Sequence, residues 1–361
     1  MILILYIESG SGSLMLAKNI KKHLDERQVN NQLISLNKIL PLWLEKLLFG
    51  HYQRWCMESS SKFSYLFNSR WFYPMLYKIL PAVIRYKDAG KNQVPESFQY
   101  ADAVIGCSFY CCWFARYWQK ISGTQHSIFG VLGDYTVSPG WQLQLDRLFI
   151  PFDFQSPVFD YIRRCGGNIT VTGIPVKPYQ MNGRRVKGSV LLCGGGWGLQ
   201  ITEETITTLL ARKSLTKLIV LCGQNNLLYD NLCSQFQDYI SRDEMEVHGF
   251  IDDMYSIYAR TDIVVTKAGG LTLTEAAIYR KPLIISGYLP GHEKENMKVF
   301  VQRDAALLAE DAETLGQAID KILMDDISAD LLKKNATLLV NHQAGNLLCD
   351  EILEDMHYVD A

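Results

Sequence analysis

The sequence lacks any apolar run long enough to cross a membrane as a helix. No stretch of about 18 or more apolar residues occurs in its 361 residues. The opening letters, MILILYIESGSGS, are apolar only briefly and carry no basic leader, so they predict a buried β-strand rather than a signal peptide. The net charge is only -2, whereas bulk nucleic-acid binding usually requires a strongly basic chain. We therefore expect no nucleic-acid partner.

Paired cysteines are also missing. The chain has nine cysteines, an odd number, and none forms a CxxC pair. This spacing does not predict a metal site, and it is typical of a reducing cytoplasm in which most thiols are small buried apolar groups. We expect a cytoplasmic protein, possible contact with the inner face of the cell membrane being left open, and no metal or other cofactor.

Short apolar runs alternate with helical stretches along the whole chain. Strand-like runs such as ILILYI, ADAVIGCS and HSIFGVLGD occur in the first half, and GSVLLCGGG, KLIVLCG and TDIVVTKAGG in the second. Alternation of strands and helices predicts parallel sheets covered on both faces. The pattern restarts after VTGIPVKPYQMNGRR, which is rich in proline and glycine. We therefore predict an α/β protein with two doubly wound Rossmann-like domains, at 1–175 and 176–340, facing a central cleft.

Glycine-rich turns follow two strands of the second half. Gly194, Gly195 and Gly196 come directly after VLLC, and Gly269 and Gly270 come after VVTKA. Glycine lets backbone N–H groups approach a ligand, and the start of a following helix favours phosphate. A tight turn without a ligand is the simpler alternative for each glycine cluster taken alone.

Polar residues accompany the second of these turns. Thr272 lies where a helix is expected to begin, either as its N-cap or with its hydroxyl on a phosphate. Glu275 follows one turn later among apolar residues, where its carboxylate is suited to both ribose hydroxyls of a nucleotide. His292, Glu293 and Asn296 cluster after the next strand, and a sugar needs such groups because each hydroxyl must be paired on leaving water. The three turns together predict a site for a nucleotide-diphosphate sugar.

The segment GFIDDMYSIYARTDIVVTKAGGLTLTEAAIYRKPLIISGYLPGHEKENMKVFV resembles the donor-binding half of GT-B glycosyltransferases of family 28. That family includes monogalactosyldiacylglycerol synthases, processive diacylglycerol glucosyltransferases and the peptidoglycan N-acetylglucosaminyltransferase. VTGIPV and GDYTVSPGW resemble the diacylglycerol sugar transferases in particular. The resemblance implies a GT-B fold, a UDP-sugar donor that needs no metal, and a C-terminal helix, 341–361, that returns to the first domain.

The resemblance also implies roles for individual residues. It implies uracil binding by the segment from residue 248 to 251, ribose binding by Glu275, a diphosphate cradle at the glycine turns, and sugar contacts after the third turn. The implied donor-side residues are Gly194, Gly195, Gly196, His248, Gly249, Phe250, Ile251, Lys267, Gly269, Gly270, Leu271, Thr272, Glu275, His292, Glu293 and Asn296. The implied acceptor-side residues are Gly10, Ser11, Gly12, Ser13, Ser138 and Trp141, with Asp134 as the candidate general base.

Three positions depart from the family pattern. Ser13 and Ser138 stand where the family has histidines, and His292 stands where glutamine is common. Serine cannot accept a proton near neutral pH as imidazole does, and removing one acid/base group typically lowers a rate by about 10²–10⁴. Donor binding is thus expected to be retained while the acceptor chemistry has changed.

The segment 60–87 is rich in aromatic residues interspersed with lysine and arginine. This mixture suits an anionic membrane surface, although a helix pair kinked at Pro74 and packed on the core would look similar. FYCCWFARYWQ, from Phe109 to Gln119, predicts a buried helix first and an acceptor lining second. Cys111 and Cys112 are expected in the core rather than in catalysis.

The leading functional hypothesis is an inverting transferase that moves a hexose from a UDP-sugar to a lipid or other hydrophobic acceptor. Two alternatives remain open at this stage. One is a UDP-sugar sensor or scaffold without transfer activity, which the two missing histidines favour. The other is a UDP-sugar epimerase of the same fold, which needs more carboxylates and histidines around the sugar than His292 and Glu293 provide.

Overall fold

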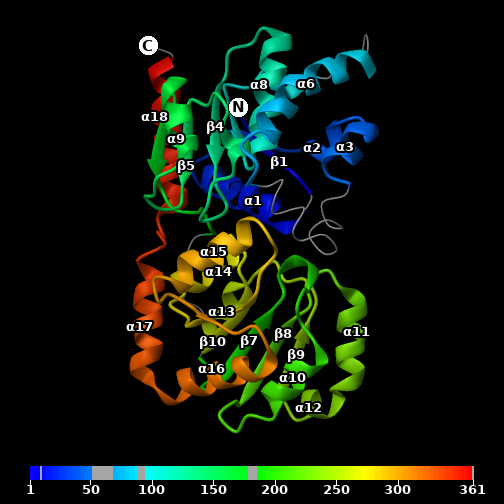
Figure 1. The fold of residues 1–361 in the computed structure, drawn as a ribbon, viewed down its shortest axis with the longest axis vertical. Coiled ribbons are helices and arrows are strands. Elements are labelled where there is room, and N and C mark those ends of the chain that lie inside the picture. The colour runs from blue at the N-terminus through cyan, green and yellow to red at the C-terminus, as the bar shows by residue number, and fades with distance from the viewer. Residues whose placement is uncertain (9, 51–67, 88–93, 178–184, 360–361) are drawn as a thin grey trace. The chain divides into compact units, whose positions relative to one another are not determined.

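The computed structural model describes residues 1–8, 10–50, 68–87, 94–177 and 185–359. The chain divides into two compact units (Figure 1). The first unit holds Met1–Lys177, Pro290–His292 and His342–Ala361, and the second holds Pro178–Leu289 and Glu293–Asn341. The domain limits predicted from the sequence, residues 175 and 340, remain predictions. The observed division also assigns the short segment Pro290–His292 to the first unit.

The first unit is built on a parallel six-stranded sheet in the order β2-β1-β3-β4-β5-β6. The strands are β1 (Ile2–Tyr6), β2 (Asn31–Ser35), β3 (Ala103–Gly106), β4 (Ser127–Val131), β5 (Arg147–Ile150) and β6 (Asn168–Val171). Every residue of β1 is buried, as expected of a central strand covered on both faces. The order reverses between β1 and β3, so the loops after these two strands diverge at that point.

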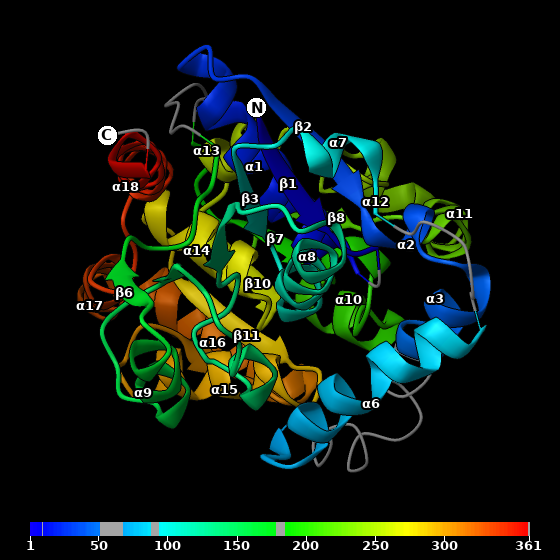
Figure 2. The ribbon, with the colours of Figure 1, turned by 90° about the horizontal axis from the view of Figure 1, so that it is seen from above.

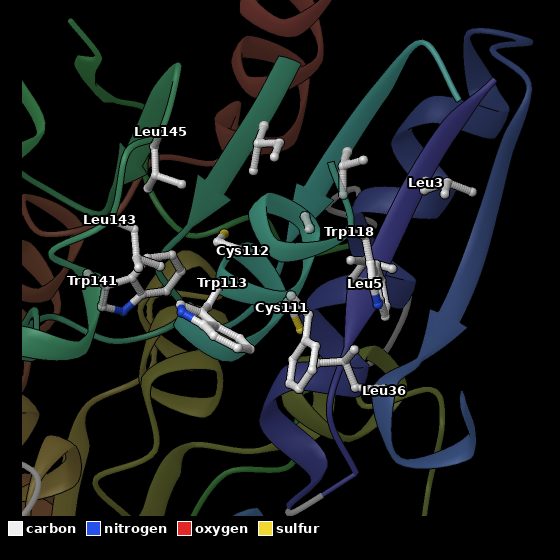
Figure 3. Packing of buried hydrophobic residues seen from close by; sticks show 14 of the residues in the cluster. Leu3, Leu5, Leu36, Cys111, Cys112, Trp113, Trp118, Trp141, Leu143 and Leu145 are labelled. Atoms are coloured by element: carbon white, nitrogen blue, oxygen red, sulfur yellow. The ribbon is translucent and has the colours of Figure 1, made fainter. Parts of the chain in front are cut away.

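Helices cover both faces of this sheet (Figures 1 and 2). They are α1 (Ser11–Glu26), α2 (Leu36–Ile39), α3 (Leu42–Leu48), α6 (Phe72–Lys87), α7 (Glu96–Gln99), α8 (Phe109–Ser122), α9 (Pro157–Arg164) and α18 (Ala344–Val359), with a short 3₁₀ turn, η1, at Pro139–Trp141. Figure 3 shows α8 contributing Cys111, Cys112, Trp113 and Trp118 to the core. The segment predicted as a buried helix is therefore a core helix.

The C-terminal helix α18 packs on α1. Arg27, the C-cap of α1, forms an ion pair with Asp350 at 3.0 Å, and Arg147 of β5 forms ion pairs with Glu351 and Asp355. At the start of α18, a Cβ on Gly345 would lie 2.2 Å from the ring of His23. Only glycine allows the two helices this approach.

The second unit repeats the design with the order β12-β11-β10-β7-β8-β9. Its strands are β7 (Ser189–Cys193), β8 (Lys217–Leu221), β9 (Met245–His248), β10 (Ile263–Lys267), β11 (Leu283–Gly287) and β12 (Leu307–Leu308). Its helices are α10 (Glu203–Leu210), α11 (Asn226–Gln235), α12 (Gln237–Ser241), α13 (Tyr255–Arg260), α14 (Gly270–Ile278), α15 (His292–Val301), α16 (Ala312–Met324) and α17 (Asp326–Thr337), with a 3₁₀ turn, η2, at Gly195–Trp197. Taken from its first strand, this is the 3-2-1-4-5-6 order of dinucleotide-binding sheets.

Candidate donor-nucleotide site

The two glycine turns lie where the strand order of the second unit reverses. β7 and β10 are neighbours in the sheet, with Cys193 paired to Thr266 at their carboxyl ends. The chain leaves β7 toward β8 on one side, and leaves β10 toward β11 on the other. Ligands of open α/β sheets bind at such a reversal, beyond the carboxyl ends of the strands. The turns after β7 and β10 are thus the first place to look for a ligand.

The turn after β7 is glycine-rich for reasons of space. Gly195 has a φ of 69°, and a Cβ there would lie 2.5 Å from Cε of Lys267. The sequence analysis expected the N-terminus of a following helix to add positive charge to this turn. η2 follows instead, and α10 begins only at Glu203, with its N-terminus already capped by Thr202 and acidic in its first turn. This first turn can therefore offer backbone amides but no helix dipole.

The turn after β10 does lead straight into a helix. α14 starts at Gly270, with Gly269 in an extended conformation at the N-cap, and no side-chain hydrogen bond caps it within the described chain. The amides of Gly270, Leu271 and Thr272 occupy the first turn, where an α-helix leaves its N–H groups without intrahelical acceptors. The sequence had allowed Thr272 as the N-cap, but Thr272 is the third residue of the helix. A helix terminus of this kind is suited to an anion.

Glu275 lies one turn further along α14 and is half-buried. The hydroxyl of Tyr258 donates to its Oε2 at 3.1 Å. Burial, and then the nearby Glu275 carboxylate, raise the pKa of Tyr258, so this phenol stays a donor. Tyr258 is a site residue that the sequence analysis missed, because its segment, SIYAR, shows only the spacing of a buried helix.

Lys267 and Glu293 form a buried ion pair beside the same turn. The ammonium of Lys267 donates to Oε1 of Glu293, and the side chains are 15% and 4% exposed. The backbone N–H of Leu289 donates to Oε2 of Glu293 at 2.7 Å. Asn296, fully buried, donates its side-chain N–H to the carbonyl of Ala268 at 3.0 Å. Asn296 therefore braces the β10 turn, a contact that the sequence analysis did not foresee.

His248 closes β9, and its carbonyl accepts from the N–H of Cys222 at 2.8 Å. The residues after it, Gly249, Phe250 and Ile251, leave the strand at the same carboxyl edge, with Phe250 45% exposed. The ring Nε2 of His248 lies 3.0 Å from Glu246. Burial opposes the charge of Glu246, but hydrogen bonds from Arg260, Lys217 and His248 prevail and lower its pKa to about 2.

The predicted acceptor-side residues belong to the first unit, where the Ser13 hydroxyl is bonded to two backbone groups. Its hydroxyl accepts from the N–H of Ile7 at 3.2 Å and donates to the carbonyl of Cys107 at 3.4 Å. Ser13 thus joins the ends of β1 and β3 where the strand order reverses. Gly10 is the N-cap of α1, and Ser11, Gly12 and Ser13 are the first three residues of that helix.

Asp134, Ser138 and Trp141 lie together on the loop after β4. Asp134 is half-buried, while Ser138 and Trp141 are buried, and the Ser138 hydroxyl has no hydrogen-bond partner among the residues described. Cys111 and Cys112 on the adjacent α8 are buried, and burial raises the pKa of both thiols. These two cysteines are therefore core residues without nucleophilic character. His292 is grouped with the first unit.

The described residues contain neither a candidate metal site nor a candidate membrane span. No group of three or more His, Cys, Asp or Glu side chains there has the arrangement of a metal site. The same residues contain no helix with the length and hydropathy of a membrane span.

Comparison with known proteins identifies the second unit. Residues 189–344 match the glycosyltransferase family 28 C-terminal domain. The second unit therefore carries a family 28 C-terminal domain. The processive diacylglycerol beta-glucosyltransferase of Bacillus subtilis is 24% identical over 257 residues, 68% of this chain and 67% of that protein. The enzyme of the same name from Bacillus pumilus is 26% identical over 239 residues, 63% of this chain and 62% of that protein.

Solved structures share the whole architecture. MurG of Acinetobacter baumannii has a TM-score of 0.59 at 15% identity, covering 98% of this chain and 99% of its own. Anabaena Alr3699/HepE in complex with UDP has a TM-score of 0.53 at 12% identity, with coverage of 98% and 99%. These likenesses confirm the predicted GT-B class of two doubly wound domains. The family 28 domain and the named relatives place the chain among the glycosyltransferases.

Proposed function

We propose that this family 28 glycosyltransferase transfers a hexosyl group from a UDP-sugar to a lipid acceptor of the diacylglycerol type, with inversion. The observation that carries the proposal is the uncapped start of α14, with Glu275 one turn on, at the strand-order reversal of a family 28 domain. Relatives named as diacylglycerol glucosyltransferases, and a structural neighbour solved with UDP, support the donor and acceptor classes.

The donor would be held by groups that are already in position. The diphosphate lies at the amides of Gly270 to Thr272, where the helix dipole stabilises the departing UDP without a metal. Glu275, oriented by Tyr258, accepts from the ribose hydroxyls, and the uracil lies at 248–251. Glu293 contacts the sugar, and Asn296 acts by holding the turn.

The transfer step needs one base. The acceptor hydroxyl oxygen attacks the anomeric carbon from the face opposite UDP. The bond from that carbon to the phosphate oxygen breaks, and UDP keeps the electron pair. Asp134 takes the hydroxyl proton, since Ser13 is bonded to backbone groups and neither serine can serve as a base at neutral pH.

A membrane surface is the proposed source of the acceptor. Met75, Ile79 and Tyr86 of α6 are exposed, and so is Trp71, which directly precedes the helix and is 86% exposed. Lys78, Arg85 and Lys87 are exposed on the same helix. Aromatic residues mixed with basic ones favour the interface of an anionic membrane. The first part of the predicted membrane segment, 60–67, lies outside the described residues. Pro74 lies within α6 and does not separate two helices.

A labelled-donor assay tests the function. The protein is incubated with radiolabelled UDP-glucose or UDP-galactose and vesicles containing diacylglycerol. Labelled glycolipid supports transfer, conversion of one free UDP-sugar into the other supports an epimerase, and binding without product supports a sensor. The sensor is the second candidate, favoured by Ser13 having a structural place in the described fold. Asp134→Asn should abolish product and spare UDP binding.

Calorimetry tests the nucleotide site separately. Glu275→Ala should weaken UDP binding by about 1–3 kcal/mol, the cost of leaving polar partners unpaired. Tyr258→Phe should weaken it less, because the carboxylate remains and loses only its orienting donor. Unchanged UDP affinity in Glu275→Ala would remove Glu275 from the site.

A further inference from the structure

Helix α6 has one solvent-exposed face and one buried face. Met75 and Ile79 are exposed on one face, and Trp71, which directly precedes the helix, is exposed as well. The other is anchored in the core of the first unit by Leu80 and Ile84, which are 2% and 1% exposed. Helix α6 therefore connects an exposed surface with the core of the first unit.

Tyr77 extends from α6 to the loop that carries Asp134. Its hydroxyl donates to the carbonyl of Gly140 at 2.8 Å, and its ring stacks on Trp113 of α8 with centroids 5.6 Å apart. Gly140 belongs to η1, the turn that follows Ser138 on the same loop as Asp134. Tyr77 thus connects the membrane-facing helix directly to the acceptor loop.

A second aromatic contact holds the turn from its other side. A Cβ on Gly140 would lie 2.9 Å from the ring of Phe109, so the backbone of the turn rests on that ring. Phe109 packs edge-on against Tyr73 of α6 with centroids 4.9 Å apart. The turn is consequently held between two aromatic residues, and both of these depend on where α6 lies.

The phenol of Tyr77 is a constant donor. Burial raises its pKa well above the ordinary tyrosine value, with Tyr110 and Tyr73 adding to the effect. The bond to Gly140 does not titrate over the pH range in which the protein works. Any change in this link must therefore come from movement of α6 or of the loop.

We infer that Tyr77 is a positioning residue, which transmits the docking of α6 on a lipid surface to the Asp134 loop through its hydrogen bond to Gly140. The inference rests on the proposed function and adds a regulatory step to it. Docking of the outer face fixes α6, α6 fixes the turn at Gly140, and the turn sets the place of Asp134 against the acceptor. Misplacement of a reacting group by about 1 Å can lower a rate by about 10²-fold.

The kinetic test compares two matched tyrosine variants of the first unit. Tyr77→Phe removes the hydroxyl and keeps the ring stacked on Trp113, whereas Tyr100→Phe removes a hydroxyl from a residue outside α6 that is 69% exposed. With vesicles of phosphatidylglycerol and diacylglycerol, Tyr77→Phe should lower kcat by about 10- to 100-fold. The KM for UDP-glucose and co-sedimentation with the vesicles should not change. Tyr100→Phe should match the wild type in all three measurements.

Hydrogen–deuterium exchange gives a readout that does not need turnover. In the wild type, exchange of the peptide from Leu132 to Gln142 should slow when vesicles are added. In Tyr77→Phe this response should be lost. If the variant fails to fold, the wild-type measurement still tests the inference, because a loop whose exchange does not respond to vesicles overturns it.

The outcomes separate the two claims. An active wild type with an equally active Tyr77→Phe overturns the inference and leaves the proposed function standing. A wild type that makes no glycolipid refutes the proposed function, and the exchange experiment then still decides whether α6 is linked to the loop. A wild-type loop whose exchange ignores vesicles overturns the inference in either case.

Discussion

The buried pair of Lys267 and Glu293 leads to a prediction about stability at the centre of the donor site. Lys267→Met removes the ammonium and keeps a side chain of similar length. It leaves the carboxylate of Glu293, 4% exposed, with the Leu289 amide but without its cation. Removing one partner of a buried ion pair typically costs about 3–5 kcal/mol. We expect a loss of that size in the free energy of unfolding of the second unit.

The double variant separates the pair from its members. With Glu293→Gln added, neither side chain of the pair carries a charge, and an apolar or neutral replacement of a buried pair is often close to neutral. The double variant should therefore be more stable than Lys267→Met alone. Residues in direct contact typically show coupling of about 0.5–3 kcal/mol, and we expect this pair to lie at the upper end.

The chain provides its own control on helix α15. Lys298 and Glu295 form an ion pair at 2.8 Å, but their side chains are 42% and 36% exposed. The same substitutions there should cost about 0–1 kcal/mol, as for other surface pairs. The assay is urea unfolding of all variants, with the second unit followed by hydrogen exchange of peptides from β10. Equal costs at the two pairs, or purely additive costs at Lys267 and Glu293, would refute the reasoning.

Two further predictions concern pH and packing. The pKa of Glu246 is lowered from 4.5 to about 2, so the stability that its ionised carboxylate contributes is complete above pH 4.5 and is lost as the pH falls toward 2. Glu246→Gln should reduce this acid-induced loss of stability by about 1–2 kcal/mol after solvent screening. An unchanged acid limb of the stability curve would contradict this prediction. Gly345→Ala should destabilise by about 1–3 kcal/mol because of the His23 ring. Gly12→Ala, which meets open space, should instead be neutral or stabilising by about 0.5–1 kcal/mol; thermal denaturation compares the two.

Central strands were predictable from the sequence because both of their faces are buried. Runs such as ILILYI and KLIVLCG are almost continuously apolar, and they form β1 and β8. The two strands that were not predicted, β2 (Asn31–Ser35) and β12 (Leu307–Leu308), lie at the sheet edges. β2 is polar in its first half and β12 has only two residues, so neither shows a clear pattern. Their pairing depends on the neighbouring strand.

Some features of the candidate site were likewise visible in the sequence, and others depended on tertiary packing. The glycines of the two turns and Glu275 stood out in the sequence, because local backbone freedom and a carboxylate on an apolar helix are visible in the letters. The sequence did not show how far the next helix lies from the first turn. Gly195 and Gly223 pack closely against neighbouring chain, and α10 begins only at Glu203. That packing joins residues distant along the chain, and no local pattern records it.

By itself the sequence determined the strand–helix alternation, the α/β class and the glycine turns, because each of these follows from hydrophobic period and backbone freedom over a few residues. Only the tertiary structure decided that Tyr258 holds Glu275, that Asn296 braces the β10 turn and that Ser13 joins β1 to β3. These contacts connect residues far apart in the chain. Their partners are chosen by strand order and packing, which pairs of letters do not specify.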